Sequence, residues 1–177
     1  MPGTVFLDGE TVTLRTIEEE DLEFLRDGVN HPDVRVDVGN HRPQNLADER
    51  EFFEEAVCGD GPVQLLICRD EEPLGVVGLE PRESDAERIG RLGIWLHPEF
   101  HGQGYGTEAM ELFVTYAFDQ LNYHKLYART HADNEASRRL FEKLGFEQEG
   151  VFRDHAYLDG SYTDLIYHAM FEEEWGH

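Results

Sequence analysis

Three glycines at alternate positions, Gly102, Gly104 and Gly106, stand at the start of an amphipathic segment. Glycines allow successive backbone N–H groups to converge on one point, and the free amides and positive dipole end of a following helix favour an anion there. The spacing therefore predicts a phosphate-binding loop that needs no lysine. A glycine-rich turn used only for tight packing is the alternative interpretation.

This loop departs from two common nucleotide-binding motifs. No Gly-Lys-Ser/Thr follows it, so it is not a Walker A loop, and Thr107 stands where a Rossmann G-x-G-x-x-G pattern needs its last glycine. Both departures disfavour an ATPase or a dinucleotide-dependent enzyme.

Two longer segments carry a family resemblance. Residues 97–109, HPEFHGQGYGTEA, and residues 134–146, NEASRRLFEKLGF, resemble the GCN5-related N-acetyltransferases, and the closer match is their ribosomal-protein alanine N-acetyltransferase branch. Leu14-Arg15, the segment 149–153 and the end from Asp164 to Trp175 support the likeness, which covers nearly the whole chain.

The resemblance implies an acetyl-CoA-dependent transfer of an acetyl group to a primary amine. In such an enzyme the loop from His101 to Gly106 wraps the pyrophosphate of acetyl-CoA, and the strand that ends near Leu96 pairs with the pantetheine arm. The residues that it assigns to the cosubstrate are Leu96, His101, Gly102, Gln103, Gly104, Tyr105, Gly106, Thr107 and Asn134.

Two positions differ from the family pattern. His101 stands where many members have Arg or Gln, which matters little because backbone amides hold the phosphate. Phe141 occupies the place of a tyrosine acid, so we take Ser137, the nearest hydroxyl of that helix, as the replacement acid. The alternative is that Asn134 and Ser137 form only an N-cap and its N3 partner.

The proposed chemistry also needs a base. An amine with a pKa near ~10 must lose a proton before it attacks a thioester, and a thiolate with a pKa of about 8.5 must gain one or be stabilised. Candidate bases are Glu80, His97 and His131, and no spacing separates them from solvated surface residues. A backbone N–H near Leu96 or His97 would meet the developing oxyanion.

The expected elements define the fold class. A hairpin is predicted from strands 4–7 and 11–14, followed by a helix over 17–29, with Thr16 and Glu19 as a capping box, and a helix over 45–58 capped by Asn45. Then come strands 63–68, 74–79 and 89–96, a helix over 104–121, a strand 125–130, a helix 135–144 closed by Gly145, and two final strands. This order predicts an α/β fold in one domain over residues 1–177, with a central mixed sheet flanked by helices.

Two functions remain open. The first is an N-acetyltransferase that works by direct attack in a ternary complex, because no nucleophile and base pair offers a covalent route. The second is a noncatalytic acyl-CoA-binding module of the same fold, which the loss of the tyrosine at Phe141 favours. The acceptor in the first case is a protein N-terminus or a small amine, and the sequence leaves the oligomeric state undetermined.

Composition excludes several other classes. With 15 basic against 38 acidic residues, the net charge of −23 disfavours nucleic acid, which binds through clustered Lys and Arg. The nine histidines and two cysteines lack metal-ligand spacing, and both cysteines are expected to be buried thiols. No apolar run approaches the ~20 residues of a membrane span, and the amino terminus lacks the basic start and apolar stretch of a signal peptide, so a cytoplasmic protein is expected.

The kind of charge is informative as well. Lys125 and Lys143 are the two lysines, the other 13 basic residues are arginines, and acids are spread evenly along the chain. This is typical of a halophilic protein, while an ordinary acidic protein is the alternative.

We expect thermal stability and activity to rise from low salt to molar KCl. At 1 M salt the screening length falls to roughly 3 Å, which relieves the self-repulsion of the acidic surface. A thermal melt against KCl concentration checks this, and a midpoint that stays flat or falls with added KCl would contradict the halophilic interpretation.

Overall fold

The structure, a computed structural model, describes residues 2–81 and 87–176. Its contacts separate into two compact units, Met1–Glu80 with Gly93–Phe113, and Pro81–Leu92 with Val114–His177. Strand β5 (Ile89–Leu96) and helix α4 (Tyr105–Asp119) each belong partly to one unit and partly to the other. The prediction of a single domain over residues 1–177 stays a prediction.

The first unit is built on an antiparallel meander. Its strands neighbour one another in chain order: β1 (Val5–Asp8), β2 (Thr13–Arg15), β3 (Val63–Arg69) and β4 (Glu72–Pro81). The predicted hairpin and the predicted meander strands are therefore confirmed.

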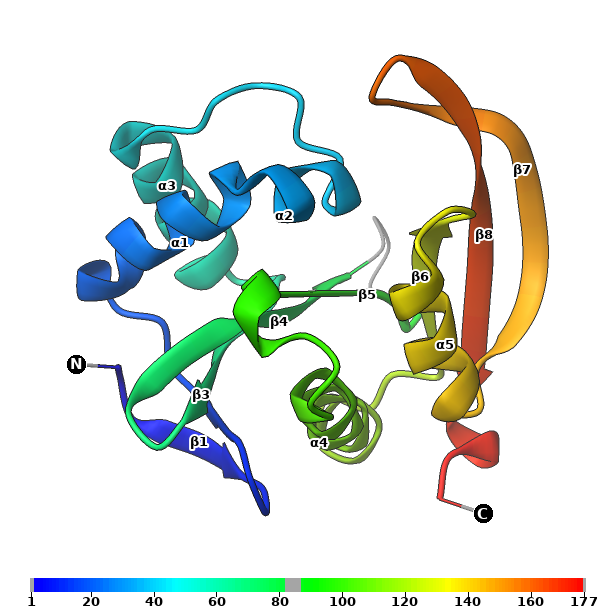
Figure 1. The fold of residues 1–177 in the computed structure, drawn as a ribbon. Coiled ribbons are helices and arrows are strands. Elements are labelled where there is room, and N and C mark those ends of the chain that lie inside the picture. Colours follow the sequence, from blue (N-terminus) through cyan, green and yellow to red (C-terminus); the bar gives the residue numbers. More distant parts are fainter. Residues whose placement is uncertain (1, 82–86, 177) are drawn as a thin grey trace. The chain divides into compact units, whose positions relative to one another are not determined.

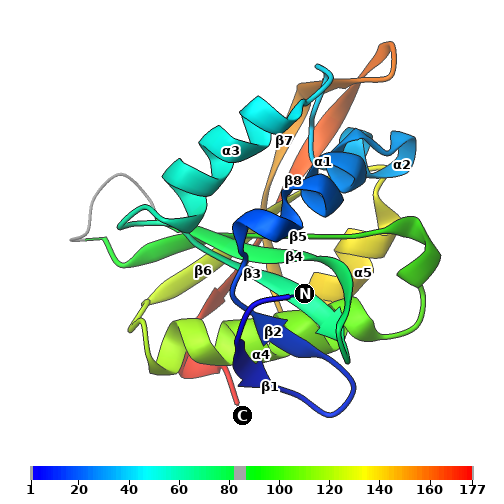
Figure 2. The same ribbon diagram turned by 90° about the vertical axis from the view of Figure 1, so that its left-hand side faces the viewer.

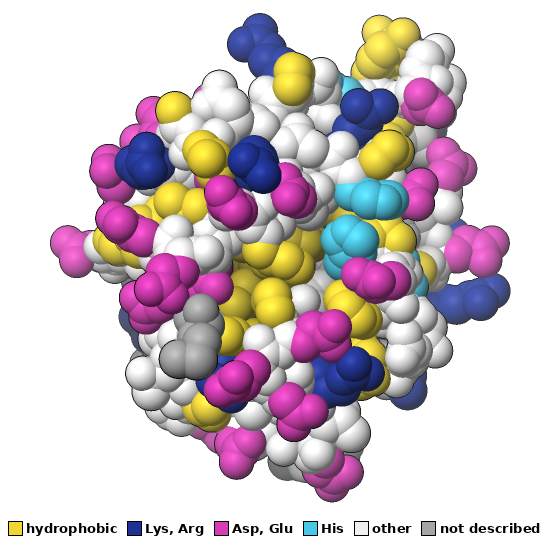
Figure 3. Space-filling view, turned by 60° about the vertical axis from the view of Figure 1, so that its left-hand side comes forward, with side chains coloured by type: hydrophobic (Ala, Val, Ile, Leu, Met, Phe, Trp, Pro, Cys, Tyr) yellow, Lys and Arg dark blue, Asp and Glu magenta, His cyan; other side chains and the backbone are white. Residues whose placement is uncertain are grey.

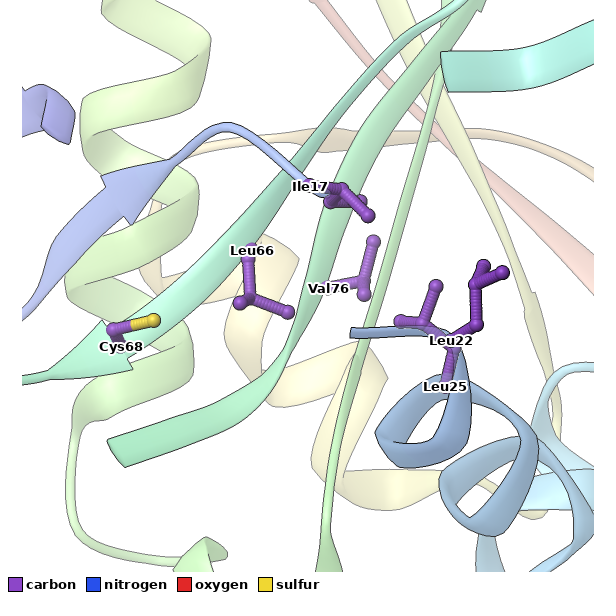
Figure 4. Packing of buried hydrophobic residues seen from close by; sticks show 6 residues of the cluster. All are labelled: Ile17, Leu22, Leu25, Leu66, Cys68 and Val76. Carbon is purple, nitrogen blue, oxygen red and sulfur yellow. The ribbon is translucent and has the colours of Figure 1, made fainter. Parts of the chain in front are cut away.

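Three short helices accompany this meander in the first unit (Figures 1 and 2). They are α1 (Leu22–Asn30), α2 (Pro32–Asp37) and α3 (Leu46–Phe52), with 3-10 turns η1 (Glu19–Asp21) and η3 (Pro98–Phe100) and a π-turn η2 (Phe53–Val57). Figure 4 shows a cluster of buried hydrophobic residues, which come from α1, β3, β4 and the segment before α1: Ile17, Leu22, Leu25, Leu66, Cys68 and Val76. Side chains that pack against this cluster include Trp95 of β5 and Phe24 of α1.

One carboxyl group lies on the buried face of α3. Glu49 is 5% exposed and stands at helical spacing between Leu46 and Phe53, which both pack against the core cluster. Burial, with a smaller contribution from the charge of Asp48, raises the pKa of Glu49 to about 7. At neutral pH this group is therefore partly protonated, unlike a carboxylate at the surface.

The second unit holds a mixed set of strands in the order β5, β6 (Lys125–His131), β8 (Ser161–Phe171) and β7 (Glu147–Leu158). The β5–β6 pairing is parallel over Ile89–Arg91, whereas β6–β8 and β7–β8 are antiparallel. Helix α5 (Glu135–Lys143) follows β6, and η4 (Glu172–Glu174) follows β8. The long β7–β8 hairpin, orange to red in Figure 1, turns at Asp159 and Gly160, which both have positive φ. The expected mixed sheet with helices is confirmed.

Several local predictions need correction. The first helix begins at Leu22 rather than near 17, because the 3-10 turn η1 precedes it, and the capping box of that turn is formed by Glu18 and Asp21, not by Thr16 and Glu19. The Thr16 hydroxyl instead accepts a hydrogen bond from the backbone N–H of Thr4 at 3.0 Å. The predicted helix 45–58 has the expected Asn45 cap but ends as an α-helix at Phe52 and continues as the π-turn.

The prediction that both thiols are buried is wrong for one of them. Cys58 is exposed, and Cys68 is buried.

Acidic side chains are scattered over the face seen in Figure 3 and outnumber Lys and Arg there. This distribution agrees with the even spread of acids along the sequence. Among the described residues, no helix is long and apolar enough to cross a membrane.

Candidate functional site

The glycine loop lies in the first unit, between η3 and α4. Gly102 and Gly104 have φ values of 71° and 89°, in the left-handed region that side chains rarely adopt. A Cβ added at either glycine would meet no atom within 4 Å, so tight packing does not explain these residues. The backbone conformation requires them and leaves open space in front of the loop.

The loop side chains hold the loop to the end of β5. The His101 ring donates from Nε2 to the carbonyl oxygen of Leu96 at 2.8 Å, and Gln103 donates to the carbonyl oxygen of Glu99 at 3.0 Å. Helix α4 then begins, with the N–H of Glu108 bonded to the carbonyl oxygen of Gly104. His101 and Gln103 therefore fix the shape of the loop, and the amides of the first turn of α4 are the groups suited to a phosphate.

A carboxylate in this first turn is hydrogen-bonded by donors from the β1–β2 turn. Glu108 accepts hydrogen bonds from the backbone N–H and the hydroxyl of Thr11 and from the N–H of Val12. Burial alone would raise the pKa of Glu108, but these hydrogen bonds lower it overall. The contacts tie the β1–β2 turn to α4 and keep the charge of Glu108 engaged there. Sequence reasoning missed this role.

A guanidinium lies beside the first residue of α4. Arg69 at the end of β3 donates to the Tyr105 hydroxyl at 2.9 Å and stands 5.7 Å from the centre of its ring. Glu72 accepts from the other side of Arg69 at 2.7 Å. Through this contact Tyr105 joins α4 to the β3–β4 turn.

Trp95, near the end of β5, packs on helix α1. Its ring stacks on Phe24 at 5.7 Å, and a Cβ at Gly28 would lie 2.3 Å from the indole. Glycine inside a helix costs ~1 kcal/mol relative to alanine, yet here it makes room for the indole ring. Gly28 thus permits close docking of α1 on β5.

His97 lies two residues further, on the same face of the chain as Trp95. Its Nδ1 is buried and stands 3.2 Å from Oε1 of Glu99, and its ring meets the ring of His31 edge to face at 5.1 Å. His31 is the N-cap of α2, a helix that the sequence analysis did not predict. The signal was the dipeptide His31-Pro32, because proline favours the first position of a helix.

The backbone at Leu96 faces away from β4. The N–H of His97 donates to the carbonyl oxygen of Leu74 on β4 at 2.8 Å. Successive N–H groups of an extended chain point to opposite sides, so the N–H of Leu96 points away from β4. Of the two amides expected for an oxyanion, Leu96 is therefore the one not directed into the β4 pairing.

Glu80 is not brought near His97. Since Leu74 stands opposite His97, Glu80 lies six residues further along β4, which corresponds to roughly 20 Å of extended strand. The two predicted bases therefore cannot act on the same amine.

The remaining predicted residues lie in the second unit. Asn134 caps α5 by accepting the backbone N–H of Ser137 at 3.1 Å, so the cap uses the backbone of Ser137 and the side chain of Asn134. Phe141 is 3% exposed and stacks on His168 at 6.0 Å. Burial lowers the pKa of His168, whose Nε2 lies 3.0 Å from the hydroxyl of Thr130. His131 ends β6.

No metal centre emerges from the parts of the chain that the structure describes. Within residues 2–81 and 87–176, no group of three or more His, Cys, Asp or Glu side chains could hold a metal ion.

The parallel strands β5 and β6 are connected through α4, and the glycine loop stands at the start of that helix. Residues 11–147 match the family model of the acetyltransferase (GNAT) domain. The chain belongs to this family and is an acetyl-CoA-dependent acetyltransferase.

Three similar proteins illustrate the range of the family. A putative ribosomal N-acetyltransferase of Bacillus subtilis, YdaF, is 26% identical and aligns over 94% of both chains. Spermidine N(1)-acetyltransferase of Escherichia coli is also 26% identical, over 93% of this chain and 88% of its own. The crystal structure of the Vibrio cholerae spermidine N-acetyltransferase with CoA and spermine has a TM-score of 0.86 at 21% identity, covering 93% of this chain and 97% of that one.

We expect Gly104→Val to weaken acetyl-CoA binding by roughly tenfold or more. The valine side chain would enter the open space before the loop, and a valine backbone would be strained at the φ of 89° that residue 104 adopts, which would displace the loop amides. Calorimetric titration measures the affinity. The matched control is Gly160→Val, which has a φ of 90° in the β7–β8 turn and equally open surroundings. Unchanged affinity in a folded Gly104→Val variant would remove the loop from the site.

Proposed function

We propose that this protein transfers the acetyl group of acetyl-CoA to a primary amine by direct attack within a ternary complex. The observation that carries this proposal is the loop at Gly102 and Gly104, whose left-handed backbone and open surroundings present amides at the start of α4. Helix starts of this kind favour phosphate through their unpaired N–H groups and dipole.

The proposed assignment of the cosubstrate follows the geometry. The amides from His101 to Thr107 would hold the pyrophosphate, and the end of β5 at Leu96 would pair with the pantetheine arm. Asn134 keeps the assignment that the family resemblance gives it, in addition to its cap. The N–H of Leu96 would stabilise the oxyanion of the tetrahedral intermediate.

His97 is the base that we favour over Glu80. It follows Leu96 directly, its ring has a carboxylate neighbour in Glu99, and Glu80 lies at the far end of β4. Ser137 would serve as the group that stabilises or protonates the thiolate. Its hydroxyl is not required by the α5 cap, which uses its backbone N–H.

The acceptor is either a protein N-terminus or a small amine such as a polyamine. The relatives named above are described as a putative ribosomal N-acetyltransferase and as a spermidine N(1)-acetyltransferase. A net charge of −23 attracts polyamines in dilute buffer, but molar salt screens this attraction. We keep the ribosomal-protein branch as the first hypothesis from the sequence motifs, together with a halophilic, cytoplasmic setting.

A noncatalytic acyl-CoA-binding module is the second candidate. It rests on Phe141, a buried ring packed on Phe146 and His168 where many family members carry a tyrosine acid.

Thiol release with a panel of acceptors tests both candidates. The panel contains ribosomal-protein N-terminal peptides, their N-terminally blocked counterparts and polyamines, each assayed from low salt to molar KCl. The enzyme should release CoA only with acceptors that have a free amine. Binding of acetyl-CoA with no amine-dependent release from any acceptor would favour the noncatalytic module.

Ser137→Ala should lower kcat roughly 10- to 150-fold, because a hydrogen bond to a charged group is worth ~1.5–3 kcal/mol. Acetyl-CoA affinity and melting temperature should change little. Asn134→Ala is the control for the helix cap and should cost ~1 kcal/mol of stability. A Ser137→Ala enzyme with full kcat would refute the role of the hydroxyl.

A further inference from the structure

A small cluster of titratable side chains surrounds His97 within the first unit. Glu99, on the turn after β5, places Oε1 3.2 Å from Nδ1 of His97. His31, at the junction of α1 and α2, places its ring 5.1 Å from the His97 ring at an interplanar angle of 67°. Behind His31 stands Asp33, whose Oδ2 is 3.9 Å from Nδ1 of His31. Phe100 closes another side of the His97 ring at 6.3 Å.

We propose that Glu99 and His31 are positioning residues for His97, which holds its proton on Nδ1 and presents a bare Nε2 to the acceptor amine. This inference rests on the proposed function. A carboxylate next to one ring nitrogen favours the tautomer that is protonated there, and the other nitrogen then becomes the acceptor. An edge-to-face aromatic neighbour fixes the plane of the ring.

The burial of Nδ1 supports this assignment. Nδ1 of His97 has almost no contact with solvent and no hydrogen-bond partner of good geometry, and Oε1 of Glu99 lies 3.2 Å from it. Buried polar atoms in proteins rarely lack a hydrogen-bond partner. A small rotation of the exposed Glu99 side chain that completes a hydrogen bond with Nδ1 of His97 is therefore favourable. The His31 ring is itself held, because its Nδ1 accepts the N–H of Asp33 at 3.3 Å, and it therefore offers the His97 ring a fixed edge-to-face neighbour.

The proton path balances as follows. The acceptor ammonium gives one proton to Nε2 of His97, and its nitrogen then forms a bond to the carbonyl carbon of the thioester. The carbon–sulfur bond breaks, and the second proton of the attacking nitrogen ends on the thiolate. His97 returns its proton to solvent, so that ammonium and acetyl-CoA yield amide, CoA thiol and one proton.

Glu99→Gln tests the carboxylate, with Asp33→Asn as its control. Each change removes one negative charge beside one ring of the histidine pair. We expect Glu99→Gln to lower kcat/KM for the amine roughly 10-fold or more, because Nδ1–H of His97 loses its carboxylate partner. Asp33→Asn should leave kcat/KM unchanged. Equal behaviour of the two variants would overturn the role of Glu99.

Two substitutions of His31 separate its ring from its cap. His31→Phe keeps an aromatic edge against His97 and loses the cap acceptor, whereas His31→Asn keeps a cap acceptor and loses the ring. Ring positioning predicts that kcat/KM falls roughly 2- to 10-fold in His31→Asn and much less in His31→Phe. The opposite order, with activity following the melting temperature, would assign His31 a structural role only.

A measurement without turnover keeps the inference separate from the proposed function. Two-bond proton–nitrogen NMR spectra of the histidine rings at pH 8.5, assigned with His97→Gln, report which nitrogen carries the proton. We expect Nδ1–H in the wild type and a shift towards Nε2–H in Glu99→Gln. A wild-type Nε2–H tautomer would overturn the proposal even if the enzyme is active, whereas an Nδ1–H tautomer without amine-dependent CoA release would retain the geometry and reject the proposed function.

Discussion

The close approach of β4 and β5 at Gly75 is the constraint on which the candidate site depends. A Cβ at this position would lie 2.0 Å from the carbonyl oxygen of Trp95 and 2.8 Å from Cα of Leu96. Because no side chain fits there, the backbone of β5 is held against β4 and its register is fixed by the bond from His97 to Leu74. That register determines the direction in which the side chains and peptide groups of residues 95 to 97 point. Trp95 and His97 therefore contact α1 and His31, while the peptide groups of Leu96 face the other side.

The proposed phosphate site of the first unit has few positively charged side chains to attract an anion. The proposed anion site lies in a chain with a net charge of −23, and the loop itself carries no lysine or arginine. In the proposed site, backbone amides would supply the attraction instead, and the nearby carboxylate of Glu108 is engaged by donors from Thr11 and Val12. Side chains such as His101 and Gln103 are left to shape the loop. Because amides would bind the anion and side chains shape the loop, the proposed site depends on backbone conformation more than on side-chain charge.

Features with a local cause could be read from the sequence. The span of β5, the Asn45 cap, the helix of α4 and the left-handed Gly145 after α5 all follow from neighbouring residues. Features that depend on distant partners could not. The six-residue helix α2 has too short an apolar pattern, and its N-cap His31 gains a partner only when His97 folds against it. Likewise, the sequence could not separate Glu80 from His97, because the pairing of Leu74 with His97 decides which end of β4 lies at the site.

The packing of Trp95 also gives the protein an optical property. The chain has two tryptophans, and each belongs to a different compact unit. Trp95 stacks on Phe24 above Gly28, whereas Trp175 donates from its indole N–H to the hydroxyl of Thr115 at 3.1 Å. Indole emission responds to the polarity and hydrogen bonding of its surroundings, so the two rings are distinct intrinsic fluorophores. Replacing one at a time with phenylalanine would leave a single reporter, and the Trp95 signal would come from the residue next to Leu96.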